Sequence, residues 1–331
     1  MTLARFFELV LLSLSTVGLA MAASPSAAQT WPIKPIRMVV GFPPGALPEV
    51  LGRVVAAKMT PALGQSIIVE SKPGAAGSIA ASEVARAAPD GYTIMVGVAA
   101  NLAVAPHLLP SANYDPSKAF AAIGIIQRSP YFVTARSDLP VANLRDLIAY
   151  AKANPDKLNF ATPGTGTPHH LTWELLMLRT GMKMTHIPVQ AAQMVTETLA
   201  GRTHVFMDSA TSPIVSNVKT GNFKFLAMTG AARMNAQPQV PTVAEQGVSG
   251  VASYAYNGLV APAGTPREII VRLNAELNRA LAMSDVLERL RAEGVPTEQG
   301  VSSTPEEFAA WIASEYAGWG KVIKDAGIVL K

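Results

Sequence analysis

The stretch VVGFPPGALPEVLGRVVAAKM, Val39–Met59, passes from an apolar run through a turn rich in proline and glycine into a helical pattern. A second stretch, NFATPGTGTPHHLTWELLML, Asn159–Leu178, repeats this order about 120 positions later. Each turn therefore lies between the carboxyl end of a strand and the amino end of a helix, which is where open α/β sheets bind ligands. We expect the two turns to face each other and to hold a small anion between them.

The rest of the chain continues the alternation of strands and helices. Short apolar runs rich in β-branched residues predict strands at 36–40, 66–70, 131–135, 159–161, 185–187, 205–208 and 225–228. The segment 89–97 predicts a turn at Asp90-Gly91 followed by the third strand. Helical spacing predicts helices at 48–63, 77–87, 143–153, 169–180, 192–199 and 213–220, and a mostly helical tail from Pro266. This order predicts two α/β units, each with a mostly parallel sheet and right-handed crossovers.

The composition is that of a folded protein with a large core. Of the 331 residues, 49% are hydrophobic and 15% are charged, which allows two domains and argues against disorder. The net charge of +4 is scattered without a Lys/Arg run, so we expect no nucleic-acid partner. Cysteine is absent, which excludes disulfides, thiolate nucleophiles and cysteine metal ligands.

The amino terminus has the pattern of a secretory signal. Arg5 precedes an apolar stretch that reaches Ala20, and Ala20-Met21-Ala22 forms an A-x-A cleavage pattern. We expect a signal peptide over 1–22, with a second possible cleavage site after Ala28. The mature protein is then expected to be soluble and exported.

The first turn can hold an anion with main-chain groups alone. Gly45 can adopt backbone angles that other residues resist. Ala46 and Leu47 then offer N–H groups at the start of a helix, where they lack intrahelical partners and carry the positive end of the helix dipole. A carboxylate is held at such a place without any arginine or lysine.

The second turn has the same parts and more hydroxyl groups. Gly164 and Gly166 allow close approach of the backbone to a ligand, and Thr162, Thr165 and Thr167 can each donate a hydrogen bond. Either turn alone is better explained as an ordinary strand–helix connection with a cap. Two such turns in matching positions favour a binding site.

Other kinds of site lack their motifs. The sequence GTGTPH in the second turn lacks the third glycine of a dinucleotide fingerprint, and the chain contains neither a P-loop nor a G-x-S-x-G elbow. His169 and His170 are neighbours on a helix and point about 100° apart, so we expect capping or packing rather than metal binding. Asp208 has two interpretations, as a cap for the next helix or as an acceptor for a ligand hydroxyl or amine. We expect no catalytic residue, no metal and no cofactor.

Several segments in order resemble one known family, the Bug receptors, which are periplasmic solute-binding components of tripartite tricarboxylate transporters. The resemblance spans nearly the whole mature chain and rests on WPIKPIRMVVGFPPG, LGQSIIVESKPGAAGSIAASEVARAAPDGYTIMVG, YDPSKAFAAIG, LNFATPGTGTPHHL, VPTVAEQG, GLVAPAGTP and STPEEFAAWIASE. It implies a two-lobed periplasmic-binding-protein fold of the Venus flytrap type, in which each lobe is a central β-sheet flanked by helices.

The resemblance also implies domains and function. Lobe 1 would be discontinuous, 24–130 and 254–331, and lobe 2 would be 131–253. The protein would be a monomer in the periplasm that captures a small organic carboxylate between its lobes and delivers it to a membrane permease, without catalysis. Two alternatives stay open, a ligand-sensing subunit of a signalling system and, less favoured, a hydrolase that uses a threonine or histidine of the second turn.

The resemblance assigns the anion to the two turns, with the loop after the third strand and Asp208 beside them. The predicted ligand-binding residues are Phe42, Pro44, Gly45, Ala46, Leu47, Ala99, Ala100, Asn101, Thr162, Gly164, Thr165, Gly166, Thr167, His169, Val189, Gln190 and Asp208.

Departures from the family pattern make the expected site less polar. Ala46 replaces a second glycine, and Pro48 removes an N–H donor. The sequence VAAN, 98–101, replaces a loop usually rich in serine and threonine, and Val189-Gln190-Ala191 replaces Tyr-Lys-Gly. We infer a ligand with one carboxylate and an apolar or aromatic body.

Overall fold

The computed structural model describes residues 31–293, 295 and 303–329. The chain divides into a segment 1–33 and a compact unit 34–331, and the fold described below is that of the second unit. The predicted signal peptide, 1–22, and both predicted cleavage sites, after Ala22 and Ala28, lie outside the described residues.

Two sheets organise the compact unit, and the first contains the turn that follows Val40. Its strands in spatial order are β2 (Ile67–Ser71), β1 (Ile36–Val40), β3 (Thr93–Val98), β10 (Tyr254–Pro262) and β4 (Phe120–Pro130). β1 pairs in parallel with β2 and β3, whereas β10 is antiparallel to both β3 and β4. Met38, Val39 and Val40 are fully buried because helices cover both faces of this sheet.

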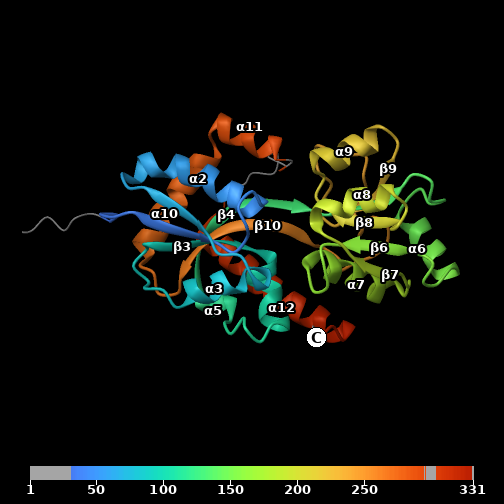
Figure 1. Cartoon of the computed structure of the whole chain (residues 1–331), viewed down its shortest axis with the longest axis horizontal. Helices are drawn as coiled ribbons and strands as arrows, with labels where there is room; N and C mark the ends of the chain where they lie inside the picture. The colour runs from blue at the N-terminus through green and yellow to red at the C-terminus, as the bar shows by residue number, and fades with distance from the viewer. Residues whose placement is uncertain (1–30, 294, 296–302, 330–331) are drawn as a thin grey trace, which may run out of the picture. The chain divides into compact units, whose positions relative to one another are not determined.

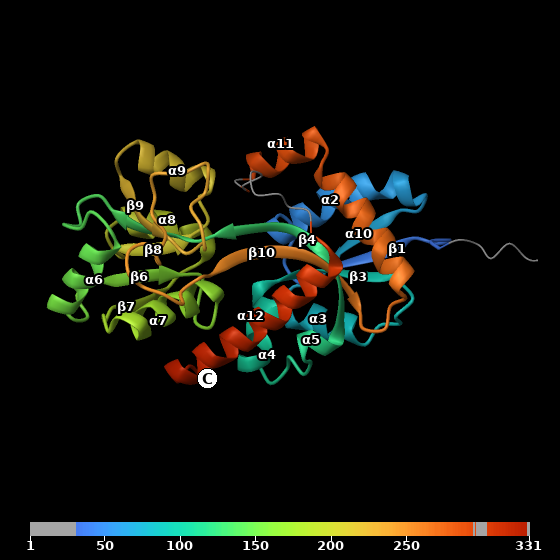
Figure 2. The same ribbon diagram turned by 180° about the vertical axis from the view of Figure 1, so that it is seen from behind.

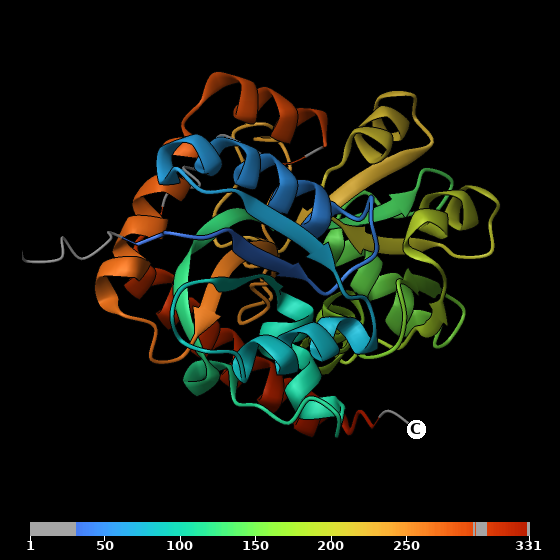
Figure 3. The ribbon, with the colours of Figure 1, turned by 60° about the vertical axis from the view of Figure 1, so that its left-hand side comes forward.

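The helices around the first sheet form a layer on each face. They are α2 (Leu47–Leu63), α10 (Arg267–Leu281) and α11 (Ser284–Ala292) on one side, and α3 (Ser78–Ala85), α4 (Ala105–Leu108), α5 (Pro116–Ala119) and α12 (Pro305–Ala326) on the other. Figures 1 and 3 show α2 above the sheet and α3 below it. Ala80, Val84, Phe308 and Ile312 pack with Met95 in the core under the α3 and α12 layer.

The second sheet contains the turn that follows Thr162. Its strands in spatial order are β7 (Thr185–Pro188), β6 (Asn159–Thr162), β8 (Val205–Asp208), β5 (Phe132–Arg136) and β9 (Phe223–Met228). β6 pairs in parallel with β7 and β8, and β5 is antiparallel to β8 and β9.

Helices also flank the second sheet on both faces (Figure 1). They are α6 (Leu144–Ala153) and α7 (Pro168–Thr180) on one face, and α8 (Met194–Leu199) and α9 (Ser212–Lys219) on the other. Leu147 of α6 and Trp173 of α7 pack with Val133 and Val205 on the first face. Met194 and Ile214 pack against Phe206 on the second.

The chain crosses between the sheets at two places. β4 ends at Pro130 and β5 begins at Phe132, so only Tyr131 separates strands of different sheets. The return crossing is at Ser253, immediately before β10. Thr229 joins the crossings, because its N–H donates to the Tyr131 carbonyl at 2.8 Å and its carbonyl accepts the Ser253 N–H at 3.2 Å.

The prediction of a mostly parallel arrangement is confirmed for β1, β2 and β3 and for β6, β7 and β8, but each sheet is mixed rather than parallel throughout. β4 and β10 were not predicted as strands, and both run antiparallel to their partners in the first sheet. β5 was predicted as a strand, but it is antiparallel to both of its neighbours. One strand of each sheet, β10 in the first and β5 in the second, thus runs against the other four. Both lie at the crossings, which β4 and β5 form in one direction and β10 forms on the return (Figure 2).

Candidate functional site

Three loops of the first sheet meet at one edge. Because β1, β2 and β3 are parallel, the loops that follow them emerge at the same end of the sheet. A Cβ atom on Gly41 would lie 2.6 Å from Cα of Gly77, so only glycine permits this approach. A Cβ on Gly77 would in turn lie 3.2 Å from Cε2 of Phe42 and 2.9 Å from Nδ2 of Asn101. The loop after β2 is therefore packed directly against both the turn after β1 and the loop after β3.

Asn101 positions these loops. Its side chain is fully buried, its Oδ1 accepts the Val98 N–H at 2.9 Å and its Nδ2 donates to the Gly77 carbonyl at 3.5 Å. The Tyr114 hydroxyl donates to the Asn101 carbonyl at 2.6 Å. Asn101 lies in a short π-helical turn, η2 (Ala100–Val104), and not in a strand or an α-helix. Its amide thus holds the backbone of two loops in place.

The first turn uses the N–H groups of Gly45 and Ala46 internally and leaves that of Leu47 free of an acceptor within the helix. The Gly45 N–H donates to Oε2 of Glu49 at 3.1 Å, and the Ala46 N–H donates to the Pro43 carbonyl at 3.1 Å. Leu47 opens α2, so its N–H has no acceptor within the helix. Gly45 has φ +83°, whereas Ala46 is extended at φ −70°, ψ 148°. Alanine at position 46 is therefore accommodated without strain.

Glu49 is a buried acid hydrogen-bonded to the first turn. Its side chain is 5% exposed and forms an ion pair with Arg53, one helical turn later. Burial opposes ionisation of this carboxyl, but the hydrogen bonds from the Gly45 N–H and Arg53 outweigh it and lower the pKa of Glu49. The chain thus places its own carboxylate on the Gly45 N–H.

We expect Glu49→Gln to make the free energy of unfolding less sensitive to a fall in pH. The pKa of Glu49 is lower in the folded chain than in the unfolded chain, so its ionised form stabilises the fold above the unfolded pKa. That stabilisation is lost as the pH falls through the folded pKa. Urea unfolding at pH 7 should show the variant about 1 kcal/mol less stable than wild type, and at pH 3 the two should converge. The control is Glu288→Gln, an exposed position on α11; a constant difference at both pH values would contradict the expectation.

The loops of the second sheet also meet at one edge. β6, β7 and β8 are parallel, and the Val189 N–H after β7 donates to the Thr162 carbonyl at the end of β6, at 3.0 Å. A hollow of about 530 Å³ lies beside this edge. Its lining residues are Pro163, Pro188, Val189, Gln190, Gln193 and Glu197. Val189 and Gln190 therefore lie next to the second turn.

The second turn is fixed from within by two of its threonines. The Gly164 carbonyl accepts the Thr167 hydroxyl at 2.7 Å and the Thr162 hydroxyl at 3.2 Å. Gly164 has φ +141° and Gly166 has φ +75°, angles that favour glycine. Thr162 and Thr167 thus hold the turn with the hydroxyls that were expected to donate to a ligand. Thr165 is exposed, and neither its N–H nor its hydroxyl has an acceptor in the part of the chain that the structure describes.

Two histidines, His170 and His186, contact residues of the second turn. His170 is 6% exposed, and its Nδ1 accepts the Gly166 N–H at 3.2 Å, while its Nε2 lies 3.3 Å from Oε1 of Glu174. The His186 ring stacks on His170 with centroids 4.1 Å apart, and its Nε2 lies 2.6 Å from the Thr162 hydroxyl. Burial, with a smaller contribution from His170, lowers the pKa of His186 to about 4. His186 is therefore uncharged at neutral pH.

His169 and Asp208 form a polar pair at the same edge. His169 Nε2 lies 3.5 Å from Asp208 Oδ1, and the His169 ring lies against Tyr131 with centroids 4.6 Å apart. His169 Nδ1 is buried and has no hydrogen-bond partner among the described residues. The carboxylate of Asp208 accepts the adjacent Ser209 N–H at 2.7 Å, whereas the N-cap of α9 is Thr211. Asp208 is thus not the cap of α9, and its carboxylate remains beside His169.

The structure gathers the predicted residues into two groups, one at each sheet edge. Phe42, Gly45, Ala46, Leu47 and Asn101 belong to the first edge, where Ala99 is 4% exposed and Ala100 is half-buried. The sequence analysis missed Gly41, Gly77, Glu49 and Tyr131. The glycine-rich PGAAGS before α3 and the i, i+4 pair of Glu49 and Arg53 were the available signals.

The described residues show neither a metal site nor a membrane span. Within 31–293, 295 and 303–329, no three His, Asp or Glu side chains are arranged to hold a metal ion. Every helix of these ranges is too short or too polar to cross a lipid bilayer.

Comparison with known proteins identifies similar chains. Residues 51–328 match the family described as "Tripartite tricarboxylate transporter family receptor". The protein BugT of Bordetella pertussis is 33% identical over 333 residues, covering 100% of both chains. The UPF0065 protein in the tcbD-tcbE intergenic region of Pseudomonas sp. strain P51 is 34% identical over 315 residues, covering 94% of this chain and 92% of that one.

Solved structures are similar over the same length. Rpa4515 of R. palustris, solved with adipate, has a TM-score of 0.75 at 32% identity and covers 90% of this chain and 99% of its own. MatC of Rhodopseudomonas palustris, solved with malate, has a TM-score of 0.73 at 31% identity, covering 88% and 100%. The periplasmic binding protein BugD has a TM-score of 0.71 at 32% identity, covering 91% and 100%. These likenesses confirm the expected two-lobed α/β fold.

Proposed function

The chain belongs to the receptor family of tripartite tricarboxylate transporters, the Bug receptors, and from this premise we propose that it captures a small organic carboxylate in the periplasm for delivery to a membrane permease. The relatives solved with adipate and with malate support a carboxylate as the ligand class. Binding needs no covalent chemistry and no cofactor.

The observation that carries the proposal is the second turn. Its glycines hold a conformation that places the unpartnered Thr165 N–H at the amino end of α7, a position that favours negative charge. Two threonine hydroxyls and His170 brace the turn, so the donors are held in place before a ligand arrives. Such preorganisation reduces the entropy that binding costs.

The first turn supplies the opposite side of the proposed site. The Leu47 N–H at the start of α2 is the donor that remains there, because Glu49 and Pro43 accept the other two. The Glu49 carboxylate, which is paired with Arg53, already accepts the Gly45 N–H, so the first turn has one main-chain donor for a carboxylate and none for a second. Phe42 and Ala99 would contact the ligand's apolar body, and Val189 would do so from the loop after β7.

Closure would occur about the two crossings between the sheets. Lobe 1 would comprise 24–130 and 254–331, and lobe 2 would comprise 131–253, so the hinge would lie at Tyr131 and Ser253. The Ser253 hydroxyl lies 2.8 Å from the Thr172 hydroxyl of α7, the helix that begins directly after the second turn. A ligand that contacts both turns would favour the closed arrangement.

A catalytic function has less support. The Thr162 hydroxyl lies 2.6 Å from His186 Nε2, as a nucleophile lies beside a base, but Thr162 is fully buried. A signalling subunit would use the same ligand site, and identification of the membrane partner by pull-down distinguishes it from a transport receptor.

Calorimetry with matched acids tests the proposal. We expect one-to-one binding of a monocarboxylate such as hexanoate or benzoate, at least tenfold tighter than adipate or phthalate of matched skeleton. Absence of binding to every small carboxylate would refute the proposed function. Tighter binding of the dicarboxylates would refute the assignment of a single carboxylate and leave the ligand class intact.

A further inference from the structure

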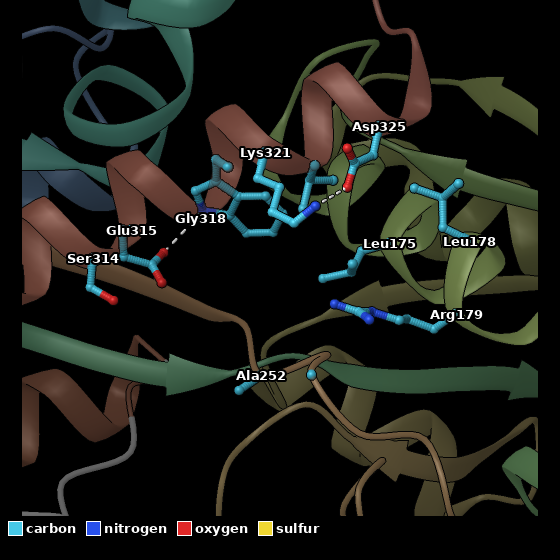
Figure 4. A pocket seen from close by; sticks show the side chains of 12 residues that line it. Leu175, Leu178, Arg179, Ala252, Ser314, Glu315, Gly318, Lys321 and Asp325 are labelled. Carbon is cyan, nitrogen blue, oxygen red and sulfur yellow. Dashed lines mark hydrogen bonds and ion pairs between the residues drawn. The ribbon is translucent and has the colours of Figure 1, made fainter.

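A cavity of about 520 Å³ lies between α7 and α12, away from the two turns. Its lining residues are Leu175, Leu178, Arg179, Gly250, Ala252, Ser314, Glu315, Gly318, Trp319, Lys321, Val322 and Asp325. Figure 4 shows side chains of α7 and α12 directed into it from opposite sides. A volume of 300–1,000 Å³ is usual for small-molecule sites.

Most of the wall is apolar, with one free cation. Leu175 and Leu178 of α7 and Trp319 and Val322 of α12 form the apolar surface. The guanidinium of Arg179 makes no hydrogen bond or ion pair within residues 31–293, 295 and 303–329, and it lies over Gly250, where a Cβ would be 3.3 Å from Nη2. The other cation, Lys321, is paired with Asp325 at 2.6 Å.

Glu315 lines the end of the cavity opposite Arg179 (Figure 4). Its Oε2 accepts the indole N–H of Trp319 at 3.0 Å. Burial raises the pKa of Glu315 to about 7, against the opposing effects of the Trp319 hydrogen bond and Arg128. Near neutral pH a large share of molecules therefore carry this carboxyl uncharged, which makes the end beside Trp319 compatible with an apolar group.

Gly318 keeps the cavity open. It lies on α12 between Glu315 and Lys321, and an added Cβ would meet nothing within 4 Å. By contrast, a Cβ on Gly320 of the same helix would lie 2.6 Å from the His107 ring. A larger side chain at position 318 would thus enter the cavity without striking the backbone.

We propose that this cavity is a second binding site, which takes an amphipathic monocarboxylate with its carboxylate on Arg179 and its apolar body against Trp319. Arg179 is suited to a carboxylate because its planar guanidinium donates two parallel hydrogen bonds. The apolar walls disfavour an inorganic anion. A dianion is disfavoured because Lys321 is already paired with Asp325, so a second carboxylate would find no free cation among the lining residues.

A ligand bound in this cavity would contact both α7 and α12, which pack on different sheets. α12 packs on the first sheet and α7 on the second, and Leu171, Trp319 and Val322 share one hydrophobic cluster with Ala103 and Val104 of η2. η2 is part of the loop that follows β3, and α7 begins directly after the second turn. Both therefore adjoin the proposed carboxylate site. The second site is thus positioned to influence how the lobes move.

The probe for this site is octanoate, below its micelle concentration, with suberate as the dianionic match. The readout is the indole N–H signal of Trp319 in ¹⁵N-labelled full chain, assigned with Trp319→Phe. We expect a saturable shift with octanoate, at least tenfold weaker binding of suberate, and at least tenfold weaker octanoate binding in Gly318→Leu and in Arg179→Gln. Ala317→Leu on the same helix and the exposed Arg86→Gln are the matched controls and should bind as wild type does.

A Gly164→Val background separates this site from the site at the two turns. The Trp319 response should persist there; its loss would show that the signal came from the turns and would overturn the second site. Equal octanoate affinity in wild type, Gly318→Leu and Arg179→Gln would overturn it as well. A Trp319 response in a chain that binds no carboxylate at the turns would support the second site while the proposed function failed.

Discussion

Gly164→Val is expected to weaken carboxylate binding at least about 100-fold, because it removes one or two charge-assisted hydrogen bonds from the second turn. Gly164 has φ +141°, an angle that a β-branched residue cannot hold without strain. The nearest side-chain atom to an added Cβ is Thr167 Cγ2 at 4.0 Å, so the substitution changes the backbone of the turn rather than the packing beneath it. Calorimetry measures the affinity, and circular dichroism checks the fold.

The matched control for Gly164→Val is Gly221→Val. Gly221 also has a left-handed angle, φ +79°, and open space around its Cβ position, but it lies in the turn before β9. Both variants should lose comparable stability, and only Gly164→Val should lose binding. Equal affinities in the two variants would remove the second turn from the site.

Gly41→Ala should have the largest effect on stability and should also impair binding. The added Cβ would lie 2.6 Å from Gly77 Cα and 3.0 Å from the Gly77 carbonyl oxygen, and main-chain atoms cannot rotate away. We expect a loss of about 3 kcal/mol in the free energy of unfolding, the cost of overpacking a tight contact. The first turn must shift, so the Leu47 donor moves with it. Urea unfolding and calorimetry measure the two effects.

Gly318→Ala is the contrasting variant, since its Cβ meets nothing within 4 Å. In a helix this change should stabilise the chain by about 0.5–1 kcal/mol. If Gly41→Ala proved as stable as wild type, the close approach of the loops at the first sheet edge would be contradicted.

The elements that a local pattern determines were predicted well. The helix predicted at 48–63 is α2, Leu47–Leu63, because the Pro/Gly turn and the first helical residues are adjacent in sequence. The strand predicted at 205–208 is β8, Val205–Asp208, an apolar run with an acid at its end. In both elements, the residues of the adjacent turn and the apolar run indicate the same end point for the element.

The missed strands depend on contacts distant in sequence. β4 and β10 contain glycines and alanines that suggest neither a strand nor a helix. Gly258 in β10 leaves room for Phe308, whose Cζ would lie 2.3 Å from a Cβ there. Phe308 lies 50 positions later on α12, so no local pattern could show why glycine occupies this strand.

The site was predicted at the level of turns rather than of individual atoms. Glycines between a strand and a helix located both sheet edges from sequence. Which groups stay free for a ligand depends on partners in space: Asn101 and Thr162 bind backbone, and Glu49 accepts the Gly45 N–H. Among the N–H groups of residues 45–47 and 164–167 in the two turns, those of Leu47 and Thr165 are the ones without an acceptor in the described residues.

The central claim is that these two main-chain donors, one on each sheet, hold the same carboxylate. Titration of ¹⁵N-labelled chain with the tightest acid found by calorimetry measures it directly. The account predicts that the amide protons of Leu47 and Thr165 both shift downfield and follow one saturation curve with one dissociation constant. Shifts at only one of the two amides, or two curves with different constants, would contradict it.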